Sequence, residues 1–552
     1  MKKKIFEYIV NGSDPFIDQR GKINNFRLNE KINLIATITS KKGSMRSNHY
    51  HPVQQQKCLL IKGQYVSVYK DLLNKDSSRI THVVNPGDLI MTEPNVAHTM
   101  VFTKDSIFLN LVNGEREHKN YGKTHTIPYK LVDDSEREYL VDNYKHECRV
   151  CLNESFSRFV SLGFQPHPND LLNSNKEDKY YYPLEINICK KCFNAQLSTK
   201  SNYNKIYSNY LYKSSVSKEF ANHFYKAALK YIDFFKLKKK TSFIVDIGSN
   251  DGIGLLPFKK LGFKKILGFE PSKKLSRETK KLGIKTENAF FNIKNTSKLK
   301  NKVDLILASN VFAHNDDLNE LFFSIKNSLK SNGSIVIEVQ YFLNTIKDYS
   351  FDNIYHEHVN YWTLTSLSNF MLNHQCRIFN VEEINTHGGS LRVYISKNKK
   401  ITINKSVKNI LQNESKFGIN NKKTYLNYQL ELDKKKINVI KNMNWLKKKY
   451  NKLYGYGASA KATVSMNYFG IDKGYIESMI DDNSLKIGKF IPGTGVKIIS
   501  KKKSQKFDCI IVFAWNMFSE IKKNNLDLSS TFINIRDLYE ANFIKKFSKK
   551  LS

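Results

Sequence analysis

The chain has 552 residues, more than one hydrophobic core usually organises, and this length predicts about three to four domains. Hydrophobic residues make up 40% of it, which is enough for packed cores and excludes a mainly disordered chain. The net charge of +38 is spread along the whole sequence, comes mostly from lysine, and accompanies no RNP, zinc-finger or basic-zipper pattern. We therefore expect no nucleic-acid partner and interpret the charge as a compositional bias that favours anionic substrates.

The sequence also predicts where the protein works. Its apolar runs fall short of the ~20 residues of a membrane helix, and the basic start, residues 1–16, has too short an apolar stretch for a signal peptide. We expect a cytoplasmic protein with no membrane partner. Four of its seven cysteines form two CxxC pairs, which in that compartment indicates a metal site and not disulfides.

Residues 1–130 alternate short apolar segments with turn residues, a pattern typical of an all-β barrel. The expected strands are 33–40, 57–61, 65–69, 89–91 and 107–112. Two blocks, 43–63 with His49, His51 and Gln56, and 87–98 with His98, resemble the two cupin motifs. Many metal-binding cupins carry Glu where Gln56 stands, and Glu93 and Asn95 replace the usual Pro and Gly of the second motif.

Three roles stay open for this cupin-like site. His49, His51, His98 and Gln56 could hold Fe, Mn, Ni or Zn. Alternatively, His49 and His51 could act as a metal-free acid and base, as in the cupin-type sugar-nucleotide ketoisomerases and epimerases that the domain resembles, with Arg46 on a nucleotide phosphate. The third role is a binding module or a homodimerisation surface.

Residues 146–200 are expected to form a small zinc-binding domain after a charged linker at 133–142. Each CxxC turn directs two thiolates at one point, so Cys148, Cys151, Cys189 and Cys192 complete a tetrahedron. Four protein ligands leave no open position, which predicts a structural zinc. The long separation of the pairs predicts a sizeable loop at 163–183, and His146 and His167 are spare candidates.

The segment 201–400 reads as an α/β domain with a ligand crevice. A buried strand at 243–247 ends in a tight turn that contains glycine and acidic residues, and a helical stretch follows; a second strand, 265–269, ends in Glu270. The turn offers acceptors, which suit an ammonium group and ribose hydroxyls better than phosphate. It resembles the first motif of S-adenosylmethionine (SAM)-dependent methyltransferases. The expected cofactor-binding residues are Asp246, Gly248, Asn250, Asp251, Gly252, Glu270 and Asn310.

Two further strands, 303–309 and 333–338, should bring Asn310, His314 and Glu338 to the same crevice. The densest chemical cluster follows at 355–358, Tyr-His-Glu-His. In an extended chain Tyr355 and Glu357 would share one side and His356 and His358 the other. The spacing is not HExxH, which excludes a zincin.

In order along the chain, CRVC, CKKC, DIGSNDG, GFEPS, SNVFAH, YHEHVNYW and HGGSLRV resemble the sugar C-methyltransferases, over residues 148–515. Those enzymes methylate C3 of nucleotide-linked 4-keto-6-deoxy sugars. The resemblance implies that His358 is the base, that Tyr355 and Glu357 orient the sugar, and that His314 lies across the crevice as a donor to the enolate. It also implies a pocket tyrosine, either Tyr210 or Tyr212.

Residues 401–450 read as a helical connector of one or two helices, with Leu426, Leu430, Ile437 and Ile440 at helical spacing. A second Rossmann-like domain, 451–552, contains GxGxxA from Gly455 to Ala460, followed by Asp481 and Asp482. This satisfies the dinucleotide fingerprint and makes an NAD-dependent reductase an alternative. The block also resembles the C-terminal domain of the same C-methyltransferases, which holds no dinucleotide. Ser459 and Lys461 could then meet the substrate diphosphate.

The sequence thus predicts a multidomain protein with an all-β cupin barrel, a small zinc-binding domain, a Rossmann-like SAM methyltransferase core and a second Rossmann-like domain. The expected activity is SAM-dependent C-methylation of a nucleotide-diphosphate keto-sugar in deoxysugar biosynthesis. The alternatives are a keto-sugar isomerase or epimerase through the cupin, a bifunctional enzyme, and the reductase.

Overall fold

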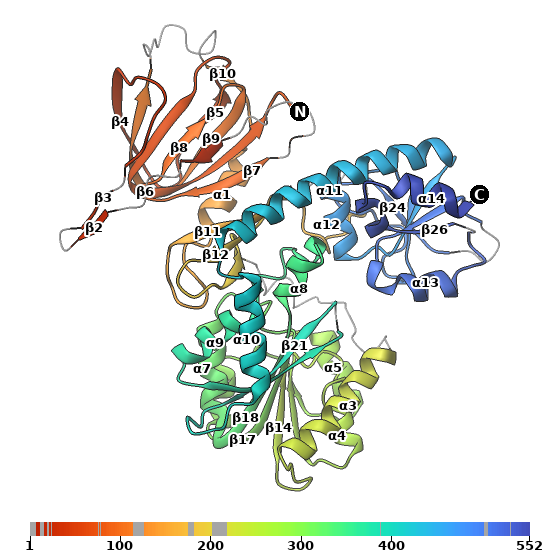
Figure 1. The fold of residues 1–552 in the computed structure, drawn as a ribbon. Helices are drawn as coiled ribbons and strands as arrows, with labels where there is room; N and C mark the ends of the chain where they lie inside the picture. The colour runs from red at the N-terminus through yellow and green to blue at the C-terminus, as the bar shows by residue number, and fades with distance from the viewer. Residues whose placement is uncertain are drawn as a thin grey trace. The chain divides into compact units, whose positions relative to one another are not determined.

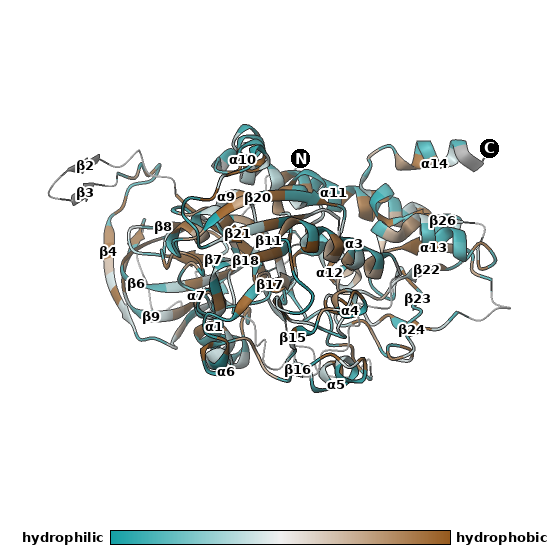
Figure 2. Cartoon of the chain, turned by 90° about the horizontal axis from the view of Figure 1, so that it is seen from below, coloured by the Kyte–Doolittle hydropathy of each residue, from teal (hydrophilic) through white to brown (hydrophobic). Residues whose placement is uncertain are grey.

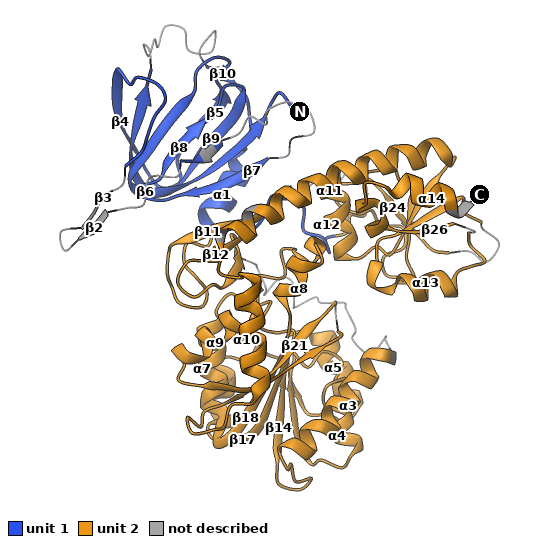
Figure 3. Cartoon of the chain, in the orientation of Figure 1, with its two compact units in different colours: residues 1–144, 161–170, 176–185 blue, residues 145–160, 171–175, 186–552 orange. Residues whose placement is uncertain are grey.

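The computed structural model describes residues 7–10, 16–18, 21–23, 25–74, 77, 79–113, 126–174, 181–200, 218–386, 388–501, 506–529 and 531–551. Tyr210, Tyr212 and His387 of the expected motifs lie outside this range. The chain forms two compact units (Figure 3). Unit 1 contains 1–144, 161–170 and 176–185, and unit 2 contains 145–160, 171–175 and 186–552.

Unit 1 is an antiparallel β-domain in which the strand order of the main sheet is β1-β8-β6-β9-β5-β10 (Figure 1). The strands are β1 (Glu7–Ile9), β2 (Phe16–Asp18), β3 (Gly21–Ile23), β4 (Leu34–Ser40), β5 (Met45–Tyr50), β6 (Gln56–Asp71), β7 (Ile80–Val84), β8 (Leu89–Thr92), β9 (Val96–Val112) and β10 (Ile127–Pro128). β2 and β3 form a separate ladder.

Two long strands allow this sheet to curl. β6 pairs with β8 through its first residues and with β7 through its last ones. In the same way, β9 pairs with β5 through its first residues and with β4 through its last ones. The sequence predicted two strands, 57–61 and 65–69, where the structure has the single strand β6. The reason is a β-bulge: the register slips on both sides of Lys62 and Gln64, and Gly63 has a φ of 93°.

The expected linker at 133–142 is instead helix α1 (Asp134–Asn143). Asp133 and Glu136 form a capping box at its start, and Leu140 packs into an apolar cluster with strands of the β-domain. Arg79 pairs with Glu136 at 2.6 Å. The charged residues of this segment therefore belong to a capped helix that is part of unit 1.

The four-cysteine segment is built on a sheet of order β11-β12-β13-β19. Its strands are β11 (Phe156–Gln165), β12 (Tyr182–Cys189), β13 (Ala195–Leu197) and β19 (Asn360–Tyr361). The expected loop at 163–183 is thus shorter than predicted, because both of its ends are strand. The boundary between the two units falls inside β11 and β12.

The central domain has a seven-stranded sheet of order β16-β15-β14-β17-β18-β21-β20, in which β21 is antiparallel to both of its neighbours. Its strands are β14 (Phe243–Ile247), β15 (Lys265–Phe269), β16 (Thr286–Glu287), β17 (Val303–Ser309), β18 (Leu329–Gln340), β20 (Arg377–Ile384) and β21 (Ser390–Ser396). The strand residues are largely hydrophobic, whereas helix α5 (Lys273–Lys281) is largely hydrophilic (Figure 2). This contrast is typical of a sheet that is covered on both faces.

Helices cover the sheet on two sides (Figure 1). The helices are α3 (Lys218–Phe234), α4 (Leu256–Lys260), α6 (Ile293–Thr296), α7 (Leu318–Ser328), α8 (Phe342–Lys347) and α9 (Leu364–Asn373), together with the short 3-10 helices η3 (Ser297–Leu299) and η4 (Phe351–Asn353). Tyr231 of α3 and Phe258 of α4 share one core cluster with Ile244 of β14. On the other face, Phe322 of α7 packs against Phe370 of α9 at 5.4 Å between ring centroids.

Two helices, α10 (Lys405–Phe417) and α11 (Lys422–Lys449), precede the C-terminal domain. Two of the residues whose spacing predicted helix here, Leu430 and Ile437, are exposed at 57% and 66%. The buried face of α11 instead carries Tyr425, Tyr428, Leu432, Val439, Met443 and Leu446. Tyr425 and Tyr428 begin this buried face and also recur at helical spacing, although a search for apolar residues alone passes over tyrosine.

The C-terminal domain is a parallel sheet of order β24-β23-β22-β25-β26. Its strands are β22 (Leu453–Tyr456), β23 (Ser478–Ile480), β24 (Lys497–Ile499), β25 (Cys509–Val512) and β26 (Phe532–Asn534). Its helices are α12 (Ala460–Phe469), α13 (Phe518–Asn524) and α14 (Phe543–Leu551), with η5 (Trp515–Met517) and η6 (Ile535–Tyr539).

Candidate functional site

The loop between β14 and α4 lies where the strand order of the central sheet reverses, because β15 and β17 flank β14 on opposite sides. Such a reversal leaves a crevice at the carboxyl ends of the strands. The chain passes this point in left-handed backbone at Gly248 (φ 66°), Asn250 (φ 49°) and Gly252 (φ 86°). The N–H of Asp251 donates to Oδ1 of Asn250 at 2.9 Å, so the loop supports itself.

The carboxylate of Glu270 is fixed against this loop by two backbone donors. The N–H of Asn250 donates to its Oε2 at 2.9 Å, and the N–H of Ser272 donates to its Oε1 at 2.7 Å. At the end of β17, Asn310 is also left-handed (φ 57°), and its N–H donates to the carbonyl of Glu338 at 2.8 Å. The ends of β14, β15, β17 and β18 are therefore all polar.

Burial raises the pKa of Asp246 to about 8, and the charge of Glu270 adds to the effect. Burial also raises the pKa of Glu270 to about 7, although its two backbone donors act in the opposite direction. Both carboxyls therefore titrate near neutrality. A ligand that brings hydroxyl or ammonium donors into the crevice would favour their ionised forms.

The segment with the Tyr-His-Glu-His cluster is a turn and not the extended stretch that the alternation assumed. The N–H of His358 donates to the carbonyl of Tyr355 at 2.9 Å, which brings these two residues to the same side. The Tyr355 hydroxyl lies 2.6 Å from Nε2 of His358, and the two rings are 4.0 Å apart. The predicted separation of Tyr355 from His358 is therefore wrong.

The contacts of His358 define its tautomer. Nδ1 lies 3.1 Å from the carbonyl oxygen of Asn353, which can only accept a hydrogen bond, so Nδ1 carries the proton. Nε2 then has the free electron pair and accepts from the Tyr355 hydroxyl. A neutral imidazole in this tautomer is suited to accept a proton at Nε2.

His314 lies beside His358, with ring centroids 4.7 Å apart. Its Nδ1 is 2.8 Å from the carbonyl oxygen of Glu357, which fixes the ring by the same kind of hydrogen bond. Burial lowers the pKa of His314 to about 4, so this imidazole is neutral at pH 7. Glu357 and His356 are themselves buried.

A buried network around Glu338 was only partly foreseen. His223 of α3 lies 3.0 Å from Oε2 of Glu338, and Nε of Arg392 donates to Oε1 at 2.7 Å. Burial alone would raise the pKa of Glu338, but the hydrogen bond to His223 and the charge of Arg392 hold it below the ordinary value. Arg392 stood in a noted motif, whereas His223 sits in a helix without any motif that could have marked it.

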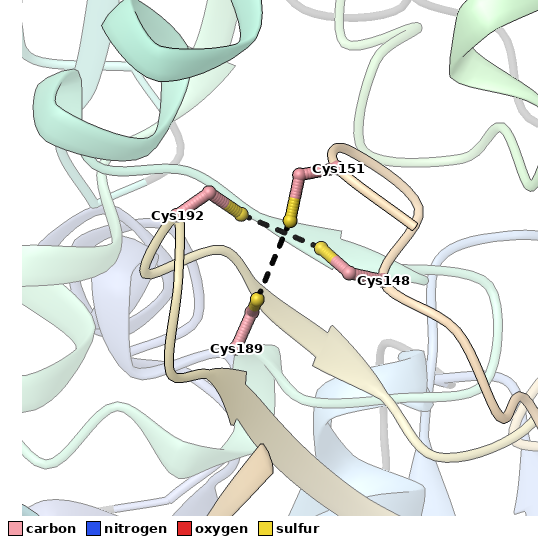
Figure 4. A group of neighbouring side chains, drawn as sticks. All are labelled: Cys148, Cys151, Cys189 and Cys192. Atoms are coloured by element: carbon pink, nitrogen blue, oxygen red, sulfur yellow. Dashed lines mark hydrogen bonds between the residues drawn. The ribbon is translucent and has the colours of Figure 1, made fainter. Parts of the chain in front are cut away.

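The four cysteines converge as predicted (Figure 4). Sγ of Cys148 lies 3.4 Å from Sγ of Cys192, and Sγ of Cys151 lies 3.6 Å from Sγ of Cys189. All four sulfur atoms lie within 4.8 Å of one another. Tetrahedral zinc with bonds of ≈ 2.3 Å needs sulfur atoms about 3.8 Å apart, so the group fits zinc.

Backbone donors also face these sulfur atoms. The N–H of Val150 points at Sγ of Cys148, and the N–H of Lys191 points at Sγ of Cys189, both at 3.4 Å. Amide donors at this position stabilise thiolates, which are the form that binds metal. His146 and His167 do not belong to the four-cysteine group.

In unit 1, three histidines meet inside the β-domain. Nε2 of His49 lies 3.0 Å from Nε2 of His51, and the ring of His98 is 4.9 Å from that of His49. Each could offer one nitrogen to a shared ion. Burial lowers the pKa of His98 well below its ordinary value, and the nearby histidines add to the shift. Gln56 begins β6, opposite Thr92. Arg46 donates to Ser40 Oγ and to the Thr39 carbonyl.

The glycine loop of the C-terminal domain is used for packing. A Cβ at Gly455 would lie 2.7 Å from the side chain of Met479, and one at Gly457 would lie 3.0 Å from that of Ala514. Oδ2 of Asp481 accepts from the N–H of Ala458 inside the loop at 2.8 Å.

Three family models match consecutive parts of the chain. A proposed zinc binding domain matches residues 148–207, a methyltransferase domain matches 218–381, and a C-methyltransferase C-terminal domain matches 385–532. With the crevice at the β14–α4 loop, they define a SAM-dependent methyltransferase. The C-terminal match narrows this class to a SAM-dependent C-methyltransferase, and segments of the chain are similar to the zinc-binding and C-terminal domains of such enzymes.

Individual proteins are similar to this chain as well. The C-methyltransferase NovU of Streptomyces niveus is 25% identical over 386 residues, which are 68% of this chain and 91% of NovU. Among solved structures, a 3,4-ketoisomerase from Helicobacter canadensis is 19% identical over 25% of this chain and 99% of its own, with a TM-score of 0.20. A SAM-dependent methyltransferase from Mesorhizobium loti is 16% identical over 31% of this chain and 97% of its own, with a TM-score of 0.25.

Among the residues that the structure describes, none of the helices is both long enough and apolar enough to span a membrane.

Proposed function

We propose that this enzyme C-methylates C3 of a nucleotide-diphosphate 4-keto-6-deoxy sugar, in the biosynthesis of a branched deoxysugar. The observation that carries the proposal is the pair His358 and Tyr355, in which a neutral imidazole presents Nε2 to the same point as a tyrosine hydroxyl. A proton on carbon next to a ketone becomes acidic when a base faces it and the enolate oxygen is stabilised.

In this proposal His358 takes the C3 proton at Nε2, since Nδ1 stays bonded to the Asn353 carbonyl. The Tyr355 hydroxyl turns from Nε2 to the sugar, and Glu357 helps to orient the sugar. His314 faces the same space, but its Nδ1 donates to the Glu357 carbonyl, so the neutral ring presents an acceptor at Nε2 and does not supply the enolate donor that the resemblance implied. The pocket tyrosine that the resemblance implies, Tyr210 or Tyr212, lies outside the described residues.

The cofactor site of the proposal is the crevice around Asp246, Gly248, Asn250, Asp251, Gly252, Glu270 and Asn310. SAM supplies an electrophilic methyl group when bound. Glu270 would accept from ribose hydroxyls, and the acidic residues of the loop would accept from the ammonium group. The protein then needs only to hold that methyl in line with the enolate carbon.

SAM affinity is expected to rise as the pH increases from 6 to 8. Below about pH 7 Glu270 is mostly protonated in the free enzyme, and above it the carboxylate is ready to accept hydroxyl donors. Binding should therefore release protons. Titration calorimetry in buffers of different ionisation enthalpy measures both effects. Glu270→Gln should weaken binding by roughly tenfold and leave only the pH dependence that Asp246, with a pKa of about 8, contributes; an unchanged pH dependence would assign the titration elsewhere.

The C-terminal domain would hold the nucleotide diphosphate. Ser459 caps α12, and Nζ of the neighbouring Lys461 lies 5.0 Å above the Trp515 ring. The indole N–H of Trp515 donates to Oδ2 of Asp352 at 2.6 Å, only a few residues before Tyr355. The start of α12 is thus linked to the catalytic turn. A reductase is not proposed, because residues 385–532 match the C-methyltransferase C-terminal domain model.

A second function is proposed for unit 1, where His49 and His51 face each other at 3.0 Å. As an acid and base they would isomerise or epimerise a keto-sugar nucleotide and make the enzyme bifunctional. With His98 and Gln56 they would instead hold a second metal. A binding module or a homodimer surface is the remaining role. All three are compatible with a cytoplasmic enzyme.

One experiment tests these proposals together. The protein is incubated with a nucleotide 4-keto-6-deoxy sugar in heavy water, with and without SAM, and the sugar is weighed by mass spectrometry. A gain of one methyl group only with SAM is expected. Deuterium uptake without methyl gain, lost in His49→Asn/His51→Asn, would move the chemistry to unit 1 and contradict the proposed role of the central domain.

A further inference from the structure

Arg149 stands between the two cysteines of the first CxxC pair, and its side chain is fully buried. Its Nε and Nη2 donate to Oδ1 of Asp316 at 2.8 and 2.6 Å. Nη1 donates to the Leu197 carbonyl at 2.8 Å, and Nη2 donates to the Thr199 carbonyl at 2.7 Å. A guanidinium is buried only when its donors are matched, so these partners fix one another in place.

The backbone of Arg149 is held as firmly as its side chain. Its N–H donates to Oε1 of Gln196 at 2.8 Å, and its carbonyl accepts from Nδ2 of Asn319 at 3.4 Å. Asn319 belongs to α7 of the methyltransferase domain, and Asp316 lies just before that helix. The first cysteine turn is therefore bonded to the start of α7.

The second cysteine turn leads to the base by a different route. It continues directly into β13, where Gln196 pairs with Asn360 of β19. The N–H of Leu197 donates to the carbonyl of Val359 at 3.0 Å, and Val359 follows His358. A strand of the four-cysteine segment thus sets the position of the chain immediately after the proposed base.

The loops that carry the two histidines are bonded to each other. The N–H groups of Val359 and Asn360 donate to the Ala313 carbonyl at 2.7 and 3.1 Å. Nδ2 of Asn360 donates to the Asn315 carbonyl at 2.8 Å. Asp316, the partner of Arg149, ends this same loop. Arg149 and β13, which belong to the four-cysteine segment, therefore hold the His314 loop and the His358 loop of the methyltransferase domain together.

We propose that Arg149 is a positioning residue for methyl transfer, through which the four-cysteine centre sets the separation of His314 and His358. This inference rests on the proposed function, because it takes His358 as the base. Arg149 does not touch the two rings; it acts through Asp316 and the 313–316 loop. Loosening this contact displaces the imidazoles, and a misplacement of ~1 Å costs on the order of 100-fold in rate.

The test compares Arg149→Lys and Asp316→Asn with the matched control Arg158→Lys, an exposed arginine of β11 in the same segment. Zinc content, SAM affinity, kcat for methyl transfer and amide hydrogen exchange are measured for each. We expect full zinc content and SAM affinity within twofold in both test variants. Their kcat should fall by about 100-fold, and amides at 313–316 and 357–361 should exchange faster, while the control stays unchanged.

The double variant sharpens the result. Because both substitutions break one contact, Arg149→Lys/Asp316→Asn should lose little more activity than either single variant. An unchanged kcat and unchanged exchange in Arg149→Lys would overturn the proposal, and so would loss of zinc, which would reduce Arg149 to a folding role. Hydrogen exchange needs no substrate. If the wild-type enzyme methylates no keto-sugar, the proposed function is contradicted. The exchange data then still decide whether Arg149 holds the 313–316 loop in place.

Discussion

Replacing His358 with alanine should abolish methyl transfer while SAM still binds with its original affinity. The imidazole is the group whose tautomer makes Nε2 an acceptor that can take a proton, and it is held there by the Asn353 carbonyl. General-base catalysis contributes typically ~10²–10⁴-fold, so His358→Ala should lose about 10²- to 10⁴-fold in kcat. Binding of SAM should persist because its proposed site lies at the β14–α4 loop.

Three measurements separate a lost base from a damaged fold. Calorimetric SAM binding should be unchanged, and the exchange of the C3 proton with heavy water should stop. Added imidazole should restore part of the methyl transfer and part of the C3 proton exchange, since a free base can occupy the space that the ring leaves. Full turnover by His358→Ala would show that another group is the base.

Tyr355→Phe is the graded comparison for this prediction. It removes the hydroxyl 2.6 Å from Nε2 but leaves the ring that packs at 4.0 Å against His358. If Tyr355 only orients the sugar, the loss in kcat should be about tenfold, the value of one hydrogen bond. A loss as large as that of His358→Ala would instead indicate that the proton passes through the tyrosine hydroxyl.

Local sequence order explains why the crevice could be predicted. Asp246, Gly248 and Gly252 follow one short apolar strand, and Glu270 follows the next. In a parallel sheet the ends of such strands meet at one edge, so the sequence alone places these residues together. The cysteine cluster was predictable for a similar reason, because each CxxC turn fixes the geometry of its own two thiolates.

The failures have physical causes as well. Alternation along an extended strand would place Tyr355 and His358 on opposite sides. A single backbone hydrogen bond closes a turn there instead and brings both side chains to the same side. The partners of Arg149 include Asp316, 167 positions away, and no periodic pattern reports a contact of that range. Helical spacing did not show which face of α11 is buried: Leu430 and Ile437 are exposed, and only tertiary packing decides this.

The second large effect is expected from the cysteine centre. Cys148→Ser/Cys189→Ser removes one thiolate from each CxxC turn and should abolish zinc binding. Zinc binding in small zinc domains is worth ≈ 10–16 kcal/mol of folding free energy, and here β13 and α9 also support the segment. Asn369 of α9, for example, donates to the Cys192 carbonyl at 3.1 Å. We therefore expect only part of the folded structure to be lost. The four-cysteine segment should unfold, while the β14–α4 crevice should keep its SAM affinity.

Metal content by mass spectrometry and hydrogen exchange by segment test this expectation. Cys376→Ser is the matched control, because Cys376 is also a buried free thiol but lies outside the cluster. The control should keep about one zinc per chain. Zinc content equal to that of the wild type in the double variant would reject the four-cysteine ligand set, whereas zinc held by the histidines of unit 1 would be present in all variants alike. If zinc is lost, exchange should rise first in the segment itself and then at 357–361, because β13 pairs with β19 directly after His358. A variant that lost zinc but kept both this protection and full methyl transfer would show that the centre supports its own segment and not the active site.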